Sequence, residues 1–338
     1  MTENKTISVI GAGSWGTALA LVLAENQNNV FLWGHNRRTV RKLQEERQNK
    51  KYLPGIQFPD NLKITGDLEL CVGQSAIILM VVPSHGLRDV FNKLAAMLPD
   101  KAYIISAVKG IENSSLETMT MIMESVLQQR YPEKNCEIGV LSGPSFAKEV
   151  AQRVPTAVTL GFKNLATAKK LQKVFGNSFF RVYAGCDITG LEISASYKNI
   201  IAIAAGVCDG LGYGLNTRAA LITRGLTEMT RLGTALGADI STFSGLSGLG
   251  DLLLTCTGNL SRNRTVGLKL GKGKQLEEIV NEMKMVAEGI KTTRSIFEIR
   301  KKYTVETPIL DEVYKIIYQG KKCSLAVSDL LARELKVE

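Results

Sequence analysis

A glycine-rich turn near the N-terminus has the spacing of a dinucleotide-binding site. In ISVIGAGSWGTALALVLAEN, Gly11, Gly13 and Gly16 form G-x-G-x-x-G between an apolar strand pattern and an Ala/Leu-rich helix pattern. In such a turn the first glycine permits a sharp bend, the second admits a pyrophosphate, and the third lets helix and strand pack closely. The bare motif is weak, but its place at the first strand of a βαβ unit predicts dinucleotide binding. The alternative is a glycine-rich turn in another kind of α/β protein.

The residues after the second strand pattern bear on which dinucleotide binds. NAD enzymes usually place an acidic residue there for the ribose 2′-hydroxyl. Residues 34–38 read Gly-His-Asn-Arg-Arg instead, and a basic cluster can accommodate a 2′-phosphate. We therefore predict NADP(H) as the preferred cofactor, with NAD(H) possible, through His35 and Arg37. The alternative is that Arg37 and Arg38 only begin the next helix in solvent.

One lysine lies in an otherwise small and apolar stretch, SASYKNIIAIAAGVC (194–208). In a helix, Lys198 would share a face with Ser194, Ala195, Ile201, Ala202 and Ala205. Lysine is almost never fully buried unless paired, and in a dry site its pKa falls. Beside a nicotinamide, such a lysine would act as general acid in ketone reduction and general base in alcohol oxidation. The alternative is a side chain that reaches solvent at the helix edge.

The stretch that follows Lys198 resembles the signature of NAD(P)-dependent glycerol-3-phosphate dehydrogenases. In KNIIAIAAGVCDGLGYGLN (198–216), the signature positions are filled by Asn199, Ala202, Gly206, Asp209, Gly210, Gly214 and Asn216. Ser196-Tyr197 departs from the small and aliphatic pair usual there, and we expect a local packing change. Further family blocks occur in the family order: GAGSWGTALA (11–20), VVPSH (81–85), KGIE (109–112), LSGPSFAKEV (141–150), GLSGLGDLLLTC (245–256), SRNR (261–264) and VAEGIKT (286–292).

The resemblance implies roles for individual side chains. Lys198 would be the proton acceptor, and Asp251 would lie near it in the substrate site. Other substrate contacts are implied at Lys109, Gly143, Ser145, Ser261, Arg262 and Asn263, of which the last three would grip a phosphate. Other cofactor contacts are implied at Ser14, Trp15, Lys109, Ala147, Arg262, Val286 and Glu288.

Several of these residues have plainer alternatives. Asp251 would serve as the N-cap of a helix at LLLTC, and Pro144 would begin a helix. SRNR (261–264) would be a solvated loop, and Lys109 an ordinary surface lysine. The glycine-rich stretch GLKLGKGKQ (267–275) does not fit a P-loop, and we predict a solvated loop there.

The expected secondary structure that positions these residues differs between the two halves of the chain. Apolar strand patterns at 7–11, 30–33, 76–82, 102–108, 138–143, 156–161 and 179–183 alternate with amphipathic stretches such as 87–97, 114–129 and 165–175. This predicts a Rossmann-like, doubly wound and mainly parallel sheet over residues 1–189. From residue 190 to 338 the patterns are helical, which predicts an all-helical substrate-binding domain. The resemblance likens it to the C-terminal domain of 6-phosphogluconate dehydrogenase. We expect ligands in a cleft between the domains.

Composition narrows the class of function. The 338 residues include six cysteines in no CxxC pair and two histidines, so we predict reduced thiols and no metal site. The net charge of +10 is dispersed, which favours small phosphorylated ligands over nucleic acid. We see no export segment and no run long enough for membrane insertion, and expect a cytoplasmic protein. The family resemblance implies that the protein forms a homodimer.

Taken together, the sequence predicts an oxidoreductase. It would transfer a hydride reversibly between NAD(P)H and dihydroxyacetone phosphate, giving sn-glycerol 3-phosphate for phospholipid synthesis, as in the bacterial cytosolic family members. One alternative is a relative with the same two-domain plan that oxidises a hydroxy acid. The other is an NADP-binding regulatory protein without turnover.

Overall fold

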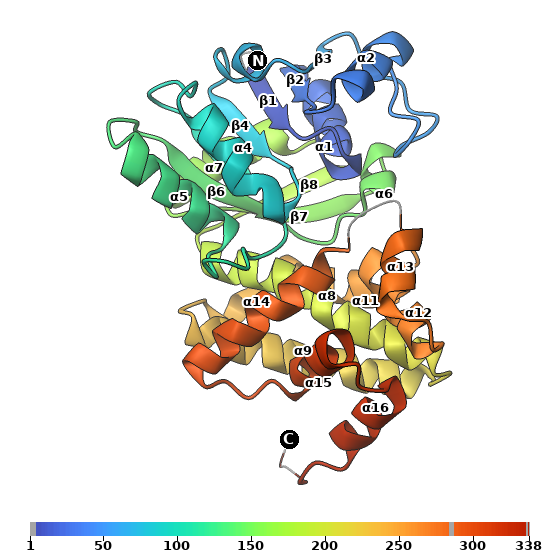
Figure 1. Cartoon of the computed structure of the whole chain (residues 1–338). Helices are drawn as coiled ribbons and strands as arrows, with labels where there is room; N and C mark the ends of the chain where they lie inside the picture. The colour runs from blue at the N-terminus through green and yellow to red at the C-terminus, as the bar shows by residue number, and fades with distance from the viewer. Residues whose placement is uncertain (1–4, 284–286, 336, 338) are drawn as a thin grey trace. The chain divides into compact units, whose positions relative to one another are not determined.

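The computed structural model describes residues 5–283, 287–335 and 337, and the chain forms two compact units (Figure 1). The first unit comprises residues 1–108 and 119–188, and the second comprises residues 109–118 and 189–338. The predicted boundary after residue 189 leaves residues 109–118 in the first domain. The structure assigns this segment to the second unit, where Ile111 is buried in the helical core.

The first unit is built on a sheet whose eight strands, within the described residues, run in the order β3-β2-β1-β4-β5-β6-β7-β8. Neighbouring strands are parallel except for the antiparallel pair β6 and β7. The strand order reverses beside β1, because the chain crosses from β3 at one edge of the sheet to β4 on the other side of β1. In α/β sheets of this kind, ligands bind at such a switch point, at the carboxyl ends of the strands. The strands are β1 (Thr6–Ile10), β2 (Asn29–Trp33), β3 (Leu62–Thr65), β4 (Ile77–Met80), β5 (Tyr103–Ser106), β6 (Glu137–Ser142), β7 (Thr156–Phe162) and β8 (Phe180–Gly185).

Helices cover both faces of this sheet. Because side chains alternate along a strand, β4 sends Ile77 and Leu79 into one core and Ile78 and Met80 into the other. The first core includes side chains of α1 (Ser14–Glu25), α2 (Arg37–Glu46), α6 (Ala147–Ala151) and α7 (Leu165–Phe175). The second includes side chains of α3 (Leu68–Val72), α4 (Leu87–Ala95) and α5 (Met119–Arg130), and the short 3-10 turn η1 (Ser84–Gly86) precedes α4. This is the predicted doubly wound fold.

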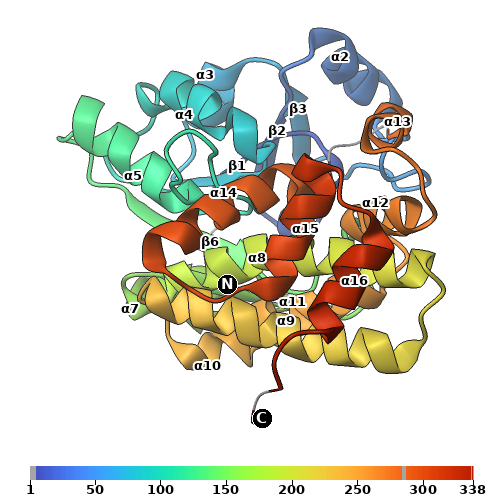
Figure 2. The same cartoon turned by 60° about the horizontal axis from the view of Figure 1, so that its bottom comes forward.

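The second unit is helical in its described residues, as predicted. The long helix α8 (Ile188–Gly210) packs against α9 (Leu215–Ala235), and Figure 2 shows the two side by side. The other elements are α10 (Ile240–Phe243), the π-helical turn η2 (Leu246–Gly250), α11 (Asp251–Thr257), α12 (Arg262–Gly271), α13 (Leu276–Glu282), α14 (Glu288–Tyr303), α15 (Pro308–Gln319) and α16 (Cys323–Leu331). Within the described residues, no helix combines the length and apolar character needed to cross a bilayer.

Glycines bring α8 and α12 into direct backbone contact. A Cβ on Gly206 would lie 2.1 Å from the carbonyl oxygen of Arg264, and one on Gly267 would lie 1.9 Å from that of Ile203. The two helices can therefore approach this closely only because these positions are glycines, which have no Cβ. Much of the predicted solvated loop at 267–275 is in fact the end of α12, and Gly267 is buried there. That prediction was wrong because Gly267 serves close helix packing, whereas the sequence pattern suggested a glycine in a loop.

Candidate active site

The glycine-rich turn has the geometry predicted for it. Gly11 has φ +127°, and a Cβ on it would lie 2.5 Å from the Val81 carbonyl oxygen. A Cβ on Gly16 would lie 1.9 Å from the Gly11 carbonyl oxygen, whereas nothing lies within 4 Å of a Cβ position on Gly13. The turn is thus tight at its first and third glycines and open at its second. The N-cap of α1 is Gly13, which has no side chain. No side-chain hydrogen bond therefore caps the amino end of this helix.

Two further observations fit a bound dinucleotide at this turn. The Nε1–H of Trp15 is buried and has no hydrogen-bond partner in the described part of the chain. His35 and Arg37 are exposed at the end of β2, where Asn36 caps α2 by accepting from the Thr39 N–H. Arg37 and Arg38 therefore form the exposed first turn of a helix, which is compatible with both readings of their sequence.

Gly143, Ser145 and Ala147 follow β6 in the same unit. Gly143 has φ +143°, and a Cβ on it would lie 2.9 Å from the Cα of Val158, so glycine is required there. The Ser145 hydroxyl donates to the Gly143 carbonyl oxygen at 3.0 Å. Helix α6 begins at Ala147, not at Pro144, so the alternative role for Pro144 is wrong.

Lys198 is buried near the middle of α8, with only 5% of its surface exposed. Its Nζ donates to Asp251 Oδ1 at 2.7 Å and to Thr255 Oγ1 at 2.8 Å. The alternative in which this side chain reaches solvent is therefore wrong. The lysine is buried because a carboxylate and a hydroxyl satisfy it.

Asp251 accepts from a second lysine. Lys109 Nζ donates to Asp251 Oδ2 at 2.7 Å, so one buried carboxylate joins two ammonium groups. Lys109 is carried by the 109–118 segment, where Ile111 and Thr118 pair and Ser295 on α14 donates to the Ile111 carbonyl oxygen. Asp251 is not a helix N-cap, because Gly250 is the cap of α11 and the carboxylate is used by the lysines. Lys109 is likewise not an ordinary surface lysine.

The cluster sets the protonation of its members. Burial lowers the pKa of Lys198 and Lys109 lowers it further, while Asp251 raises it, and the result is about 8. Burial would raise the pKa of Asp251, but the two lysines outweigh it and hold that pKa below its ordinary value. Near neutral pH the aspartate is therefore a carboxylate, and Lys198 can both hold and release a proton.

The predicted phosphate-gripping residues begin α12 rather than forming a loop. Ser261 is the N-cap, and its hydroxyl oxygen accepts from the Arg264 N–H at 3.2 Å. Asn263 is buried, and its Oδ1 accepts from the Gly289 N–H at 3.0 Å. These contacts use acceptor atoms and leave the Ser261 hydroxyl proton and the Asn263 amide for an acceptor such as phosphate. Arg262 is the first residue of α12, and Glu288 is the first of α14. Val286 lies outside the described residues.

Sequence reasoning missed Thr255 and two buried hydroxyls. Thr255 is one helical turn after Asp251, a spacing that would have placed it on the same face. Ser194 and Ser247 have buried hydroxyl oxygens without a hydrogen-bond partner among the described residues, and each lies four residues before a member of the lysine–aspartate cluster. Their small polar side chains within apolar stretches are the signal that could have found them.

The unusual residue before Lys198 has a defined partner. Tyr197 is fully buried, and its hydroxyl donates to Glu228 Oε2 at 2.9 Å. Glu228 also accepts from the N–H groups of Ile309 and Leu310, which lie in the first turn of α15. Burial raises the pKa of Glu228 to about 7 despite these hydrogen bonds. Tyr197 and Glu228 thus form a buried polar connection between α8, α9 and α15.

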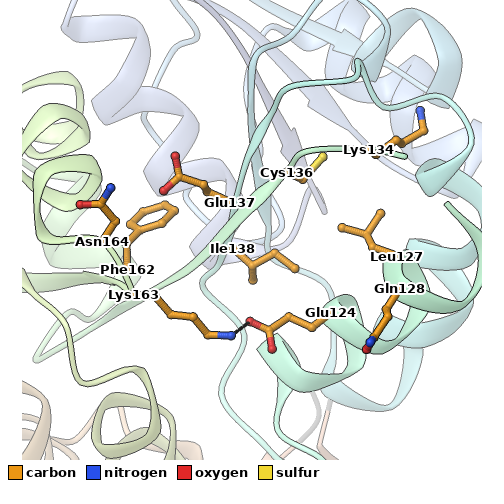
Figure 3. Close-up of a pocket in the computed structure, with 10 residues that line it drawn as sticks. All are labelled: Glu124, Leu127, Gln128, Lys134, Cys136, Glu137, Ile138, Phe162, Lys163 and Asn164. Carbon is orange, nitrogen blue, oxygen red and sulfur yellow. Dashed lines mark ion pairs between the residues drawn. The ribbon is translucent and has the colours of Figure 1, made fainter. Parts of the chain in front are cut away.

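A pocket of about 320 Å³ lies elsewhere in the first unit, between α5, β6 and the end of β7 (Figure 3). It opens at the amino end of β6, which is parallel to β1, and so at the opposite edge of the sheet from the glycine turn. Its charged groups are satisfied, since Lys163 pairs with Glu124 at 2.6 Å and Glu137 accepts from Thr167. None of the predicted site residues is among those that line it. In the described part of the chain, no group of acidic, histidine and cysteine side chains could hold a metal.

The first unit is a dinucleotide-binding α/β fold, and the second is a helical unit with a buried lysine–aspartate pair, which together define a two-domain dehydrogenase fold. Models of the N-terminus and C-terminus of NAD-dependent glycerol-3-phosphate dehydrogenase match residues 6–168 and 187–328. The chain belongs to this family.

Relatives match over nearly the full length. The chain is 60% identical over 333 residues to the glycerol-3-phosphate dehydrogenase (NAD(P)+) of Desulfotalea psychrophila, with 98% of each chain covered. A solved glycerol-3-phosphate dehydrogenase from Coxiella burnetii is similar with a TM-score of 0.92 and 40% identity, over 98% of this chain and 99% of that one. The yeast glycerol-3-phosphate dehydrogenase structure has a TM-score of 0.83 and 27% identity, over 98% of this chain and 100% of that one.

Proposed function

We propose that the protein catalyses the reversible reduction of dihydroxyacetone phosphate to sn-glycerol 3-phosphate with NAD(P)H, and that NADPH is preferred. The observation that carries this proposal is Lys198. In a chain of this family, it is a buried amine with a pKa of about 8, held 2.7 Å from a carboxylate. Such a group suits proton transfer to a ketone oxygen.

The first unit fits the dinucleotide. The open Gly13 and the unpartnered Trp15 N–H support a pyrophosphate-binding turn formed by Gly11, Gly13, Ser14, Trp15 and Gly16. The basic residues His35 and Arg37 favour a 2′-phosphate, which is the basis for preferring NADPH. We assign further cofactor contacts to Lys109, Ala147, Arg262, Val286 and Glu288. When bound, the nicotinamide supplies the hydride that the ketone carbon receives.

The second unit supplies the proton and the phosphate site. Lys198 donates a proton from Nζ to the carbonyl oxygen as negative charge develops there, and takes it back in the oxidation direction. Asp251 orients that amine and, with Lys109, keeps it in a working pKa range. We assign substrate contacts to Lys109, Gly143, Ser145, Lys198, Asp251, Ser261, Arg262 and Asn263. Anchoring the phosphate at the start of α12 orients the ketone, and such orientation can lower the activation barrier by several kcal/mol.

The setting of the reaction belongs to the proposal as well. The product would feed phospholipid synthesis in the cytoplasm, and the active form would be a homodimer, as the family resemblance implies. Size-exclusion chromatography with light scattering tests the last point, and a monomer that is fully active would contradict it.

Reduced-cofactor absorbance tests the proposed reaction. Purified protein is mixed with dihydroxyacetone phosphate and NADPH, with NADH in a parallel reaction. Rapid loss of NADPH, slower loss of NADH and formation of sn-glycerol 3-phosphate are expected. Faster loss of NADH would keep the reaction but contradict the cofactor preference. No loss of either, in a folded protein that binds NADPH, would contradict the reaction itself.

A further inference from the structure

Asp209, in the last turn of α8, forms a charge cluster with two arginines of neighbouring helices. The side chain of Asp209 is only 7% exposed. Its Oδ1 accepts from Arg218 Nε at 3.0 Å, and its Oδ2 accepts from Arg264 Nε at 2.8 Å and pairs with Arg264 Nη2 at 2.7 Å. The carboxylate thus binds α9 through Arg218 and α12 through Arg264. We call these three residues the Asp209 cluster.

Arg264 connects this cluster to the start of α12. Its Nη1 donates to Asn259 Oδ1 at 3.0 Å, and its backbone N–H donates to the Ser261 hydroxyl oxygen. Its carbonyl oxygen lies against Gly206 on α8, where a Cβ would be 2.1 Å away. Side chain, amide and carbonyl of one residue therefore fix residues 259–264 against α8.

The geometry of α8 relates this anchor to the lysine. Asp209 lies eleven residues after Lys198, which in an α-helix is about three turns and about 16 Å along the same side. One rigid helix therefore carries both the proposed proton donor and the anchor of the turn that contains Ser261, Arg262 and Asn263.

We propose that Asp209 and Arg264 are positioning residues that set the phosphate-binding turn of α12 at its working distance from Lys198. This inference rests on the proposed function, because it takes the start of α12 as the phosphate site. Two-point pairing of a guanidinium with a carboxylate fixes direction as well as distance, which a single ammonium contact does not. Loss of the carboxylate removes the contacts of the Arg264 side chain with α8, keeps its contact with Asn259, and loosens the turn that grips phosphate.

A comparison of two substrates separates positioning from general stability. Dihydroxyacetone has the reacting ketone but no phosphate, so its reduction does not depend on the phosphate-binding turn. The variants are Asp209→Asn and Arg264→Lys, and the second keeps the positive charge but loses the planar fork. For the intact protein with saturating NADPH, kcat/KM is measured for dihydroxyacetone phosphate and for dihydroxyacetone.

We expect both variants to lower kcat/KM for dihydroxyacetone phosphate about 10- to 100-fold, mainly through KM, as a small misplacement of an anchored substrate does. The value for dihydroxyacetone should change by less than about threefold, since this substrate has no phosphate for the turn to bind. Asp311→Asn is the matched control. It breaks the Arg300–Asp311 ion pair of the same unit, which is 2.7 Å long, and should leave the ratio of the two substrates unchanged.

Three results would overturn the positioning role. The first is an equal loss with both substrates, which would indicate a structural role only. The second is an unchanged kcat/KM for dihydroxyacetone phosphate in both variants. The third is that neither variant folds while Asp311→Asn does, which would assign the cluster to stability. If the unmodified protein binds NADPH but does not reduce dihydroxyacetone phosphate, the proposed function fails and this inference fails with it.

Discussion

The Lys198 amine is held between opposing influences. Burial and Lys109 favour its neutral form, while Asp251 favours the charged one. Removing either lysine from such a cluster leaves the buried carboxylate with a single cation, which changes the charge balance of the whole site. The proposed proton transfer therefore depends on a group of side chains and not on one residue.

Replacing the lysine tests its role directly. Lys198→Ala should bind NADPH with nearly normal affinity, because the dinucleotide-binding turn lies in the other unit. Its turnover should fall by a factor on the order of 10² to 10⁴, the usual contribution of a general acid. Cofactor fluorescence titration and initial rates measure the two properties. Lys269→Ala, which removes a partly exposed partner of Glu282, is the control, and full activity in Lys198→Ala would refute the assignment.

The arginine after β2 should decide the choice of cofactor. Arg37→Ala removes a charge-assisted contact worth about 1.5–3 kcal/mol, so kcat/KM with NADPH should fall roughly 10- to 100-fold. The value with NADH should stay nearly constant, because NADH lacks the 2′-phosphate. Arg41→Ala, on the same helix but paired with Glu45 at 2.8 Å, is the control. An equal decrease with both cofactors would show that Arg37 does not recognise the 2′-phosphate.

The sequence singles out individual candidate residues, but it does not give their contacts. The isolation of Lys198 in an apolar helix pattern drew attention to it, but the pattern left open whether it was paired or reached solvent, and it did not name the partner. The contact between Lys109 and Asp251 joins residues 142 positions apart, and it depends on the 109–118 segment joining the helical unit. The Asn263 contact with Gly289 likewise depends on helix packing that no local pattern encodes.

At the scale of elements, the close approach of α8 and α12 positions both Lys198 and the start of α12, where we propose that the phosphate binds. The seven predicted strands are all present, because their apolar β-branched runs are long enough to stand out. Strand β3 was missed, since LKIT offers only four residues with a lysine in the middle. The helical unit was predicted as a class, but the glycine contacts between its helices became visible only in three dimensions.

A methyl group at the contact between these helices should separate them. Gly206→Ala places a Cβ 2.1 Å from the Arg264 carbonyl oxygen, and overpacking of this kind costs about 1–3 kcal/mol or more. Urea-induced unfolding, followed by circular dichroism, should show the decrease in the free energy of unfolding. Gly214→Ala is the matched control, because nothing lies within 4 Å of its Cβ position. Equal stability of the two variants would mean that the α8–α12 contact is not tight.

At the scale of the whole molecule, the net charge of +10 suits anionic ligands. A positive protein attracts dihydroxyacetone phosphate from a distance, and salt screens this attraction as the Debye length falls from about 30 Å at 0.01 M to about 3 Å at 1 M. We expect kcat/KM for dihydroxyacetone phosphate to fall steadily over this range, while the value for neutral dihydroxyacetone changes little. Equal salt dependence for the two substrates would contradict attraction by net charge.

The pH dependence of the reaction in both directions tests most directly whether Lys198 transfers the proton. Reduction needs the protonated amine, so kcat/KM should fall as the pH rises through the Lys198 pKa of about 8. Oxidation of sn-glycerol 3-phosphate needs the neutral amine, so its kcat/KM should rise over the same range. Opposite slopes that meet near this pH are the predicted result. Rates that change in the same direction, or that stay flat through this range, would contradict the account.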